Sequence, residues 1–212
     1  MTRTITAIQP STRDPNMREV YVDHSLATTM PLSLVELLHI EVNQQWTDTL
    51  VNHISRHNET VEARRIALDL ISRRSWGINE LATRLVKRGV NQTIATETTD
   101  KLAEDGWLDD VVYAGALIRQ WLRKEPAGRK WLRHKLMEKE IPTEIVDAAI
   151  GDELGDLSEQ DSATALALIK ISKASALDDV TRRRRVISAL ARRGFTMDEA
   201  SEAYRCAQDN CA

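Results

Sequence analysis

Apolar residues recur every three or four positions from about residue 60 to the end of the chain. Ile66, Leu70 and Ile71 fall on one helical face, and Leu81 and Leu85 fall on another. Most glycines and prolines in this region lie between such segments, and strand-like alternation is scarce. A period of about 3.6 residues with frequent breaks predicts short helices and an all-α fold.

Three segments of this helical region resemble one another. They cover residues 80–90, 131–141 and 186–195, and Leu85, Leu136 and Leu190 align with spacings of 51 and 54 residues. A repeat at a fixed period predicts stacked supersecondary units. We predict an elongated tandem array of three three-helix repeats, at residues 59–109, 110–156 and 157–212.

The helix end of the second copy departs from the other two. It has Glu140 where they have Gly89 and Gly194. A left-handed cap, which favours glycine, is therefore less expected there.

The first 58 residues form an N-terminal extension in this interpretation. Residues 1–30 lack sustained periodicity and are predicted to be extended or mobile. Residues 33–57 carry an apolar residue every fourth position, from Leu34 to Ile54, which predicts one amphipathic helix. Its apolar face packs on the first repeat or, alternatively, on a partner protein.

The stretch KLAEDGWLDD, residues 101–110, reads as a corner between two helices. Gly106 suits the left-handed residue after a helix, and Asp109 or Asp110 caps the next helix. Trp107 and Leu108 are predicted to turn inward. The five tryptophans (46, 76, 107, 121 and 131) are interpreted as core or cap residues rather than as platforms for nucleic-acid bases.

Charge is distributed unevenly along a chain whose net charge is −3. Residues 116–139 carry eight basic and two acidic residues, residues 151–181 carry two basic and seven acidic ones, and residues 182–195 carry six arginines and no acid. Such blocks indicate patches that meet an anionic surface. The candidate basic surface comprises Arg119, Arg123, Arg129, Lys130, Arg133, Lys135, Arg182, Arg184, Arg185, Arg192 and Arg193.

Each basic group also has a purely structural interpretation. Arg182 to Arg185 form either a solvated, salt-bridged face or an anion contact, and Arg183 is expected to lean toward the core. Arg192 and Arg193 lie at a helix C-terminus, where the helix dipole favours cations. Arg129 and Arg133 repel each other at a four-residue spacing, which calls for a compensating anion.

Several classes of function have no support in the sequence. No phosphate-binding loop and no Ser/His/Asp or Cys/His set is evident, so we expect neither an enzyme nor a cofactor. His53 and His57 are four residues apart but lack the glutamate of a metalloprotease helix. Cys206 and Cys211 are interpreted as reduced thiols, with a local disulfide or a metal pair as the alternative. Neither a membrane span nor a signal peptide is evident, which predicts a cytoplasmic protein.

Four segments together resemble the RecX family, regulators of the RecA recombinase. They are ALDLISRRSWGINELATRLVKRGV, LAEDGWLDDVVYAGALIRQWL, GRKWLRHKLMEKEI and ARRGFTMDEASEAY, within residues 60–208. The resemblance implies a monomer of nine helices that lies in the helical groove of a RecA filament on single-stranded DNA. It also implies that such a protein restrains ATP hydrolysis, strand exchange and coprotease activity, and that it contacts the DNA in some members. Departures from the family are Glu140, the Trp76-Gly77 pair and the Val111-Val112 pair.

Two other functions fit parts of the pattern. Short helices with arginine-rich members are compatible with a helix-turn-helix regulator that reads duplex DNA. A solenoid that binds peptides is a third hypothesis, although the 51- and 54-residue spacings exceed those of common two-helix repeats.

Overall fold

The computed structural model describes residues 3–209, which divide into two compact units on either side of the Glu62–Ala63 bond. In the described part of the chain, no helix is both long and apolar enough to cross a membrane. The long helix α2 (Asp48–Ile71) includes the boundary between the units. Its first half contributes to the core of the first unit and its second half to the core of the second.

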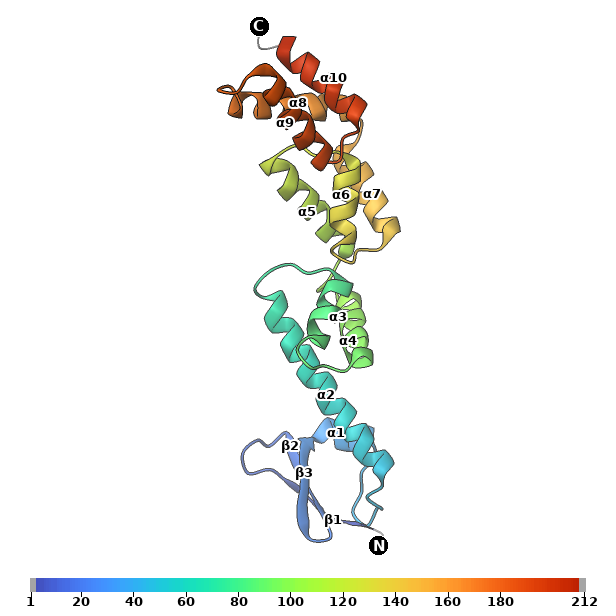
Figure 1. The fold of residues 1–212 in the computed structure, drawn as a ribbon. Helices are drawn as coiled ribbons and strands as arrows, with labels where there is room; N and C mark the ends of the chain where they lie inside the picture. The colour runs from blue at the N-terminus through green and yellow to red at the C-terminus, as the bar shows by residue number, and fades with distance from the viewer. Residues whose placement is uncertain (1–2, 210–212) are drawn as a thin grey trace. The chain divides into compact units, whose positions relative to one another are not determined.

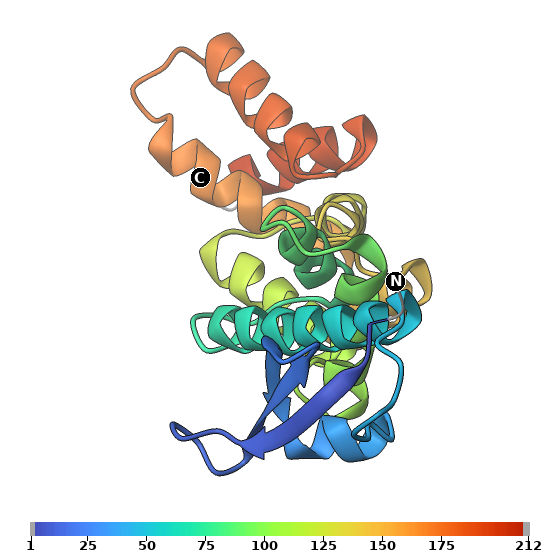
Figure 2. The same ribbon diagram turned by 90° about the horizontal axis from the view of Figure 1, so that it is seen from below.

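The first unit contains a three-stranded antiparallel sheet, so the all-α prediction was wrong for this part of the chain. The strands β1 (Ile5–Pro10), β2 (Met17–Val22) and β3 (Ser25–Pro31) pair in sequence order and are drawn in blue in Figures 1 and 2. Both residues of the Asp23-His24 turn have positive φ, as a type I′ hairpin requires. Val20 and Val22 alternate into the core, a strand period of two.

The single helix predicted at residues 33–57 is in fact two helices. α1 (Leu32–Leu37) and α2 are separated by residues 38–47, where His39 and Asn43 adopt positive φ. The Thr47 hydroxyl accepts a hydrogen bond from the Leu50 amide, so Thr47 begins α2 with a side-chain cap. Val42, placed on the apolar face by the four-residue spacing, is 47% exposed.

The second unit consists of consecutive short helices (Figure 1). After α2 these are α3 (Ile78–Val86), α4 (Gln92–Glu104), α5 (Asp110–Lys124), α6 (Arg129–Met137), α7 (Thr143–Leu154), α8 (Glu159–Lys173), α9 (Asp179–Arg192) and α10 (Met197–Asp209). Three buried clusters draw on successive triplets of these helices: α2 to α4, α5 to α7, and α8 to α10. Figure 2 shows the last triplet as one orange-to-red group. The division into three repeats with the boundaries given above is retained as a proposal.

The three aligned helix ends share one turn geometry. Leu85, Leu136 and Leu190 are fully buried, and each carbonyl accepts a hydrogen bond from the amide five residues later. Glu140 adopts the left-handed conformation despite its side chain, with φ of 60°. Its carbonyl accepts from the Asn79 amide group at 2.9 Å and its carboxylate from the Thr83 hydroxyl at 2.8 Å. These contacts offset the strain that a glycine would avoid.

The 101–110 corner is formed as predicted except for its tryptophan. Gly106 is left-handed, and the Asp109 carboxylate accepts hydrogen bonds from the Val111 and Val112 amides at the start of α5. Leu108 is buried at 5% exposure, but Trp107 is 56% exposed, so its predicted inward orientation was wrong.

Candidate functional site

Six of the eleven candidate basic residues are paired with acids of the chain itself. Arg119 pairs with Glu153, Arg129 with Glu159, Arg133 with Asp147, Lys135 with Glu138, Arg182 with Asp179, and Arg193 with Glu125. The structure therefore divides the predicted surface into a paired and an unpaired set.

The compensating anions expected around Arg129 and Arg133 are intramolecular. The Arg133 guanidinium meets Asp147 of α7. The amide of Arg129 donates to Glu159 at 2.9 Å, and its guanidinium donates to the Gly155 carbonyl at 3.1 Å. The like-charge repulsion at this spacing is thus relieved without a binding partner.

Arg193, at the end of α9, contacts Glu125 at the end of α5 and Trp131 of α6, and we call these contacts the Arg193 staple. Two of its N–H groups donate to Glu125, and its guanidinium lies 4.5 Å from the centre of the Trp131 ring. Hydrogen bonds from Lys170, and then from Arg193, hold the pKa of Glu125 below its usual value although burial opposes this. Only 20% of the Arg193 side chain is exposed, which leaves little of it for a ligand.

The arginine run at the start of α9 is held by its own acids. Asp178 caps the helix by accepting from the Thr181 amide, and Asp179 pairs with Arg182. These acids offset the unfavourable position of cations at a helix N-terminus. Arg183 is exposed rather than turned toward the core, which corrects the expectation for it.

Five of the candidates are exposed and have no hydrogen-bond or ion-pair partner among residues 3–209. They are Arg123, Lys130, Arg184, Arg185 and Arg192. Arg185 and Arg192 are seven residues apart, two helical turns, and so lie on the same side of α9. Unpaired, solvated cations are the groups best placed to bind phosphates, because no internal pair has to break first.

Sequence reasoning did not select Lys124, which shares the properties of this unpaired set. Lys124 is exposed in the last turn of α5 and lines a hollow of about 390 Å³ with Trp121, Trp131 and Lys135. Lys124 lies in the basic run of residues 116–139, and this position in the sequence could have identified it as a candidate. The two tryptophans are half-buried and pack edge to face with ring centres 5.6 Å apart. Both pack against the core of α5 to α7, as their interpretation as packing residues predicts, and each also lines this hollow.

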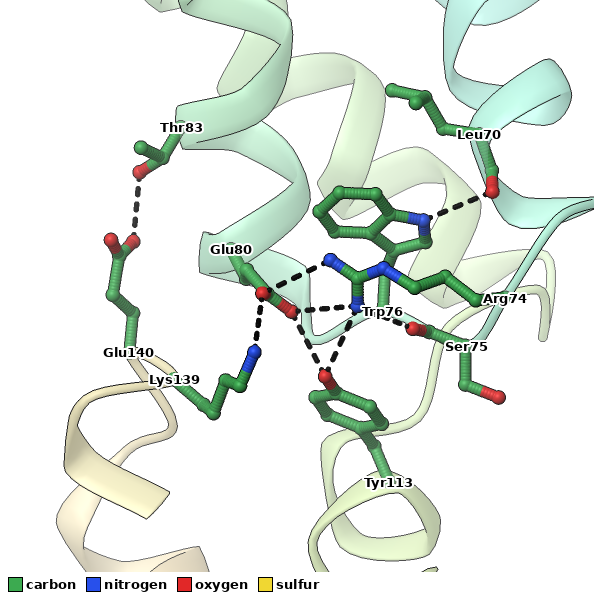
Figure 3. A network of polar contacts seen from close by, with 9 residues as sticks. All are labelled: Leu70, Arg74, Ser75, Trp76, Glu80, Thr83, Tyr113, Lys139 and Glu140. Atoms are coloured by element: carbon green, nitrogen blue, oxygen red, sulfur yellow. Dashed lines mark hydrogen bonds and ion pairs between the residues drawn. The ribbon is translucent and has the colours of Figure 1, made fainter. Parts of the chain in front are cut away.

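A second polar network centres on Glu80 of α3 and is shown in Figure 3. Its carboxylate accepts from Arg74 at 3.1 Å, from Lys139 at 2.9 Å and from the Tyr113 hydroxyl at 2.9 Å. Burial alone would raise the pKa of Glu80, but the three donors outweigh it and hold the pKa below its usual value. Burial and the Glu80 charge raise the pKa of Tyr113 to about 12. The network ties α3 to α5 and to the turn after α6.

Trp76 and Gly77 belong to the same region. Arg74 stacks on the Trp76 ring at 3.3 Å, and the indole N–H donates to the Leu70 carbonyl (Figure 3). A Cβ at Gly77 would lie 3.1 Å from Asp110, which explains a glycine there. The buried Asp110 carboxylate accepts from the Ile78 amide and so caps α3 from a distant helix. Burial raises its pKa despite that hydrogen bond.

Residues suited to metal or thiol chemistry do not gather in the described structure. Among residues 3–209, no group of three or more His, Cys, Asp or Glu side chains could hold a metal ion. Cys206 is a free thiol that donates to Glu202 at 3.4 Å. Cys211 lies outside the described residues, so neither the interpretation of the two cysteines as reduced thiols nor the alternative of a disulfide or metal pair is tested.

Comparison with known proteins identifies relatives of this chain. A family model described as "RecX, third three-helix domain" matches residues 158–204, which include most of α8 to α10. The protein named "Regulatory protein RecX" from Stenotrophomonas maltophilia is 32% identical over 145 residues, covering 68% of this chain and 86% of that one. The chain belongs to the RecX family. The RecX protein of Chlorobium limicola is 31% identical over 137 residues, covering 63% of this chain and 82% of that one.

Solved RecX structures share the fold. One described as "Crystal structure of regulatory protein RecX" has a TM-score of 0.72 and 18% identity, and the match covers 98% of this chain and 99% of that one. RecX from Lactobacillus salivarius has a TM-score of 0.59 and 18% identity, covering 72% of this chain and 98% of that one. At this identity the likeness concerns the fold alone. RecX homologues carry the name of regulatory proteins, and this chain is a RecX-family regulator.

Proposed function

We propose that this protein inhibits the RecA recombinase by binding in the helical groove of RecA filaments on single-stranded DNA. Bound there, it restrains ATP hydrolysis, strand exchange and coprotease activity, and so acts as a negative regulator of DNA repair and the SOS response. RecX membership and the resemblance described for residues 60–208 support this target. We further propose that it acts in the cytoplasm as a monomer and needs no cofactor.

The observation that carries the proposed contact is the set of cations left unpaired within the chain. A filament groove exposes DNA phosphates, and cations that replace counterions there gain affinity that falls with salt. Arg184, Arg185 and Arg192 on α9, with Arg123 and Lys130 near the α5–α6 connection, are free to make such contacts. We propose Lys124 as a sixth member.

The paired candidates have a different role in this proposal. Arg119, Arg129, Arg133 and Arg193 pair with acids from other helices or their ends, whereas Lys135 and Arg182 pair with an acid three positions away in their own helix. In this proposal all six add only long-range positive potential. Their removal would act through structure. The unpaired set is where a direct contact with DNA or recombinase is expected.

The function is tested by adding the purified protein to RecA on single-stranded DNA and following ATP hydrolysis. We expect inhibition when the protein is well below the RecA concentration, because one bound molecule blocks several subunits. Unchanged hydrolysis at equal concentrations would refute the proposal. Tight, sequence-specific binding to duplex DNA together with unchanged hydrolysis would favour the helix-turn-helix regulator instead.

The site is tested with two matched triple variants. Arg184, Arg185 and Arg192 are changed to Gln in one, and the exposed Arg84, Lys87 and Arg88 in the other, so both lose three positive charges. If each arginine meets one phosphate, the first variant lowers the slope of log affinity against log salt by about 2, at roughly 0.7 per contact. We expect the second variant to retain the wild-type slope and inhibition. Equal effects of the two variants would mean that only net charge matters.

A further inference from the structure

An exposed apolar face surrounds the corner between α4 and α5. Trp107 is 56% exposed, Val111 54% and Val112 64%. Trp107 is fixed by its backbone, since its amide donates to the Leu102 carbonyl at 2.8 Å in the turn that ends α4. The indole therefore projects from a hydrogen-bonded turn at the end of α4.

Part of this face is concave. Trp107 and Val112 line a hollow of about 370 Å³ together with Ile71, Trp76 and Ala116. The small side chain of Ala116, one helical turn beyond Val112, leaves room for an incoming group. A hollow lined by two tryptophans and small aliphatic residues has the composition of a protein-docking hot spot.

The charged residue in the wall of the hollow is an acid, opposite to the unpaired cations, and the neighbouring Arg74 on the Trp76 ring is paired with Glu80. Asp109 is the only charged residue that lines it, among the residues described. Both Asp109 cap bonds use the oxygen Oδ1, which leaves Oδ2 for another donor. Residues 100–109 carry four exposed acids. Asp105 pairs with Arg64 and Lys101, and Glu104 pairs with Lys101, whereas Asp100 and Asp109 have no ion pair within residues 3–209. Phosphates are repelled from such a rim, whereas a lysine or arginine of a protein is attracted.

We infer that the face formed by Trp107, Val112 and Ala116 docks protein rather than DNA. The occupant is a surface of a recombinase subunit that inserts an apolar side chain into the hollow and places a lysine or arginine beside Asp109. This inference rests on the proposed function and deepens it. Recombinase protein meets the acidic-apolar face, and DNA phosphates meet the cations of α9 and of the α5–α6 connection.

The test uses Val112→Glu in the full-length protein. Val112 is exposed and lies in the first turn of α5, where an added acid is favourable to the helix dipole, so the variant is expected to fold normally. Met197→Glu is the matched control, because Met197 is 61% exposed and begins α10. Half-inhibition of RecA ATP hydrolysis, binding to naked single-stranded DNA, and sedimentation are measured for each.

We expect Val112→Glu to raise the half-inhibiting concentration at least about tenfold, as loss of a hot spot does, and to leave DNA binding unchanged. Met197→Glu should stay within about twofold of wild type. If Val112→Glu inhibits RecA as strongly as the wild type does, this inference is wrong while the proposed function stands. Parallel loss of DNA binding would assign the face to DNA, and a wild-type dimer that Val112→Glu dissociates would assign it to a second copy; either result overturns it. If the wild type leaves RecA unaffected, the proposed function and this inference both fail.

Discussion

Replacing Glu80 by Gln should destabilise the helical unit by about 2 kcal/mol. Glu80 is 18% exposed and accepts hydrogen bonds from two cations and a phenol (Figure 3). A hydrogen bond to a charged group contributes roughly 1.5–3 kcal/mol when it is buried. The Arg74 and Lys139 side chains are 43% and 35% exposed, so water recovers much of the loss from each. If the hydrogen bonds from Arg74 and Lys139 each contribute about 1 kcal/mol after this solvent screening, their loss lowers the free energy of unfolding by about 2 kcal/mol.

The assay is thermal unfolding followed by helicity, for which about 2 kcal/mol corresponds to a shift of roughly 4–8 °C in a domain of this size. Glu104→Gln is the control, because Glu104 pairs with Lys101 at the surface and is 68% exposed. Its replacement should change stability by less than about 0.5 kcal/mol. Equal melting temperatures for Glu80→Gln and wild type at pH 7 would refute the reasoning.

The pH dependence gives a second, independent check on Glu80. Its pKa is lowered in the folded protein, so its contribution is complete above the usual value of 4.5 and is lost as the pH falls through the folded pKa. Protonated Glu80 resembles glutamine in charge. The difference between wild type and Glu80→Gln should therefore narrow below pH 4.5. If the difference in stability between wild type and Glu80→Gln is the same in acid as at pH 7, the contribution of Glu80 comes from packing and not from its charge.

Four further substitutions test other contacts of the second unit. Gly77→Ala should cost about 1–3 kcal/mol in urea unfolding, because its Cβ would lie 3.1 Å from the buried Asp110 carboxylate. Glu140→Gly should change stability by less than about 1 kcal/mol, since relief of left-handed strain offsets the lost Thr83 hydrogen bond. Arg193→Gln should lower the free energy of unfolding by roughly 2 kcal/mol and leave the slope of log filament affinity against log salt unchanged. Arg192→Gln should lower that slope by about 0.7 and leave the stability unchanged.

The helices of the second unit could be predicted from the sequence because periodicity and end signals agree there. The helix α5 lies between Gly106 and Pro126, two of the breaks in the apolar pattern. Asn91 caps α4 by accepting from the Thr93 amide. Thr196 and Glu199 form a reciprocal pair at the start of α10, where the Thr196 amide donates to the Glu199 carboxylate at 2.7 Å.

The N-terminal sheet was missed because its strands have little apolar alternation. Only Val20 and Val22 in β2 show it clearly, and the turn that follows is Asp23-His24 rather than a glycine turn. The long apolar spacing of residues 34–54 then suggested one helix across a region that turns twice. Leu38 and Trp46 of the connecting segment pack against the core of the first unit, which satisfies the same pattern without a helix.

The basic residues show why a candidate site is harder to predict than a helix. Arg192 and Arg193 are adjacent and chemically identical, yet one is exposed and unpaired while the other is held by Glu125 and Trp131. Periodicity reports which side of a helix a residue occupies, but an ion pair depends on an acid 68 positions away in the sequence. A variant that removes both arginines therefore combines a structural loss with a binding loss. Glu125→Gln separates them, because it releases the Arg193 staple while leaving every candidate cation in place. If the unpaired set makes the contact, Glu125→Gln lowers stability and retains the salt dependence of filament binding.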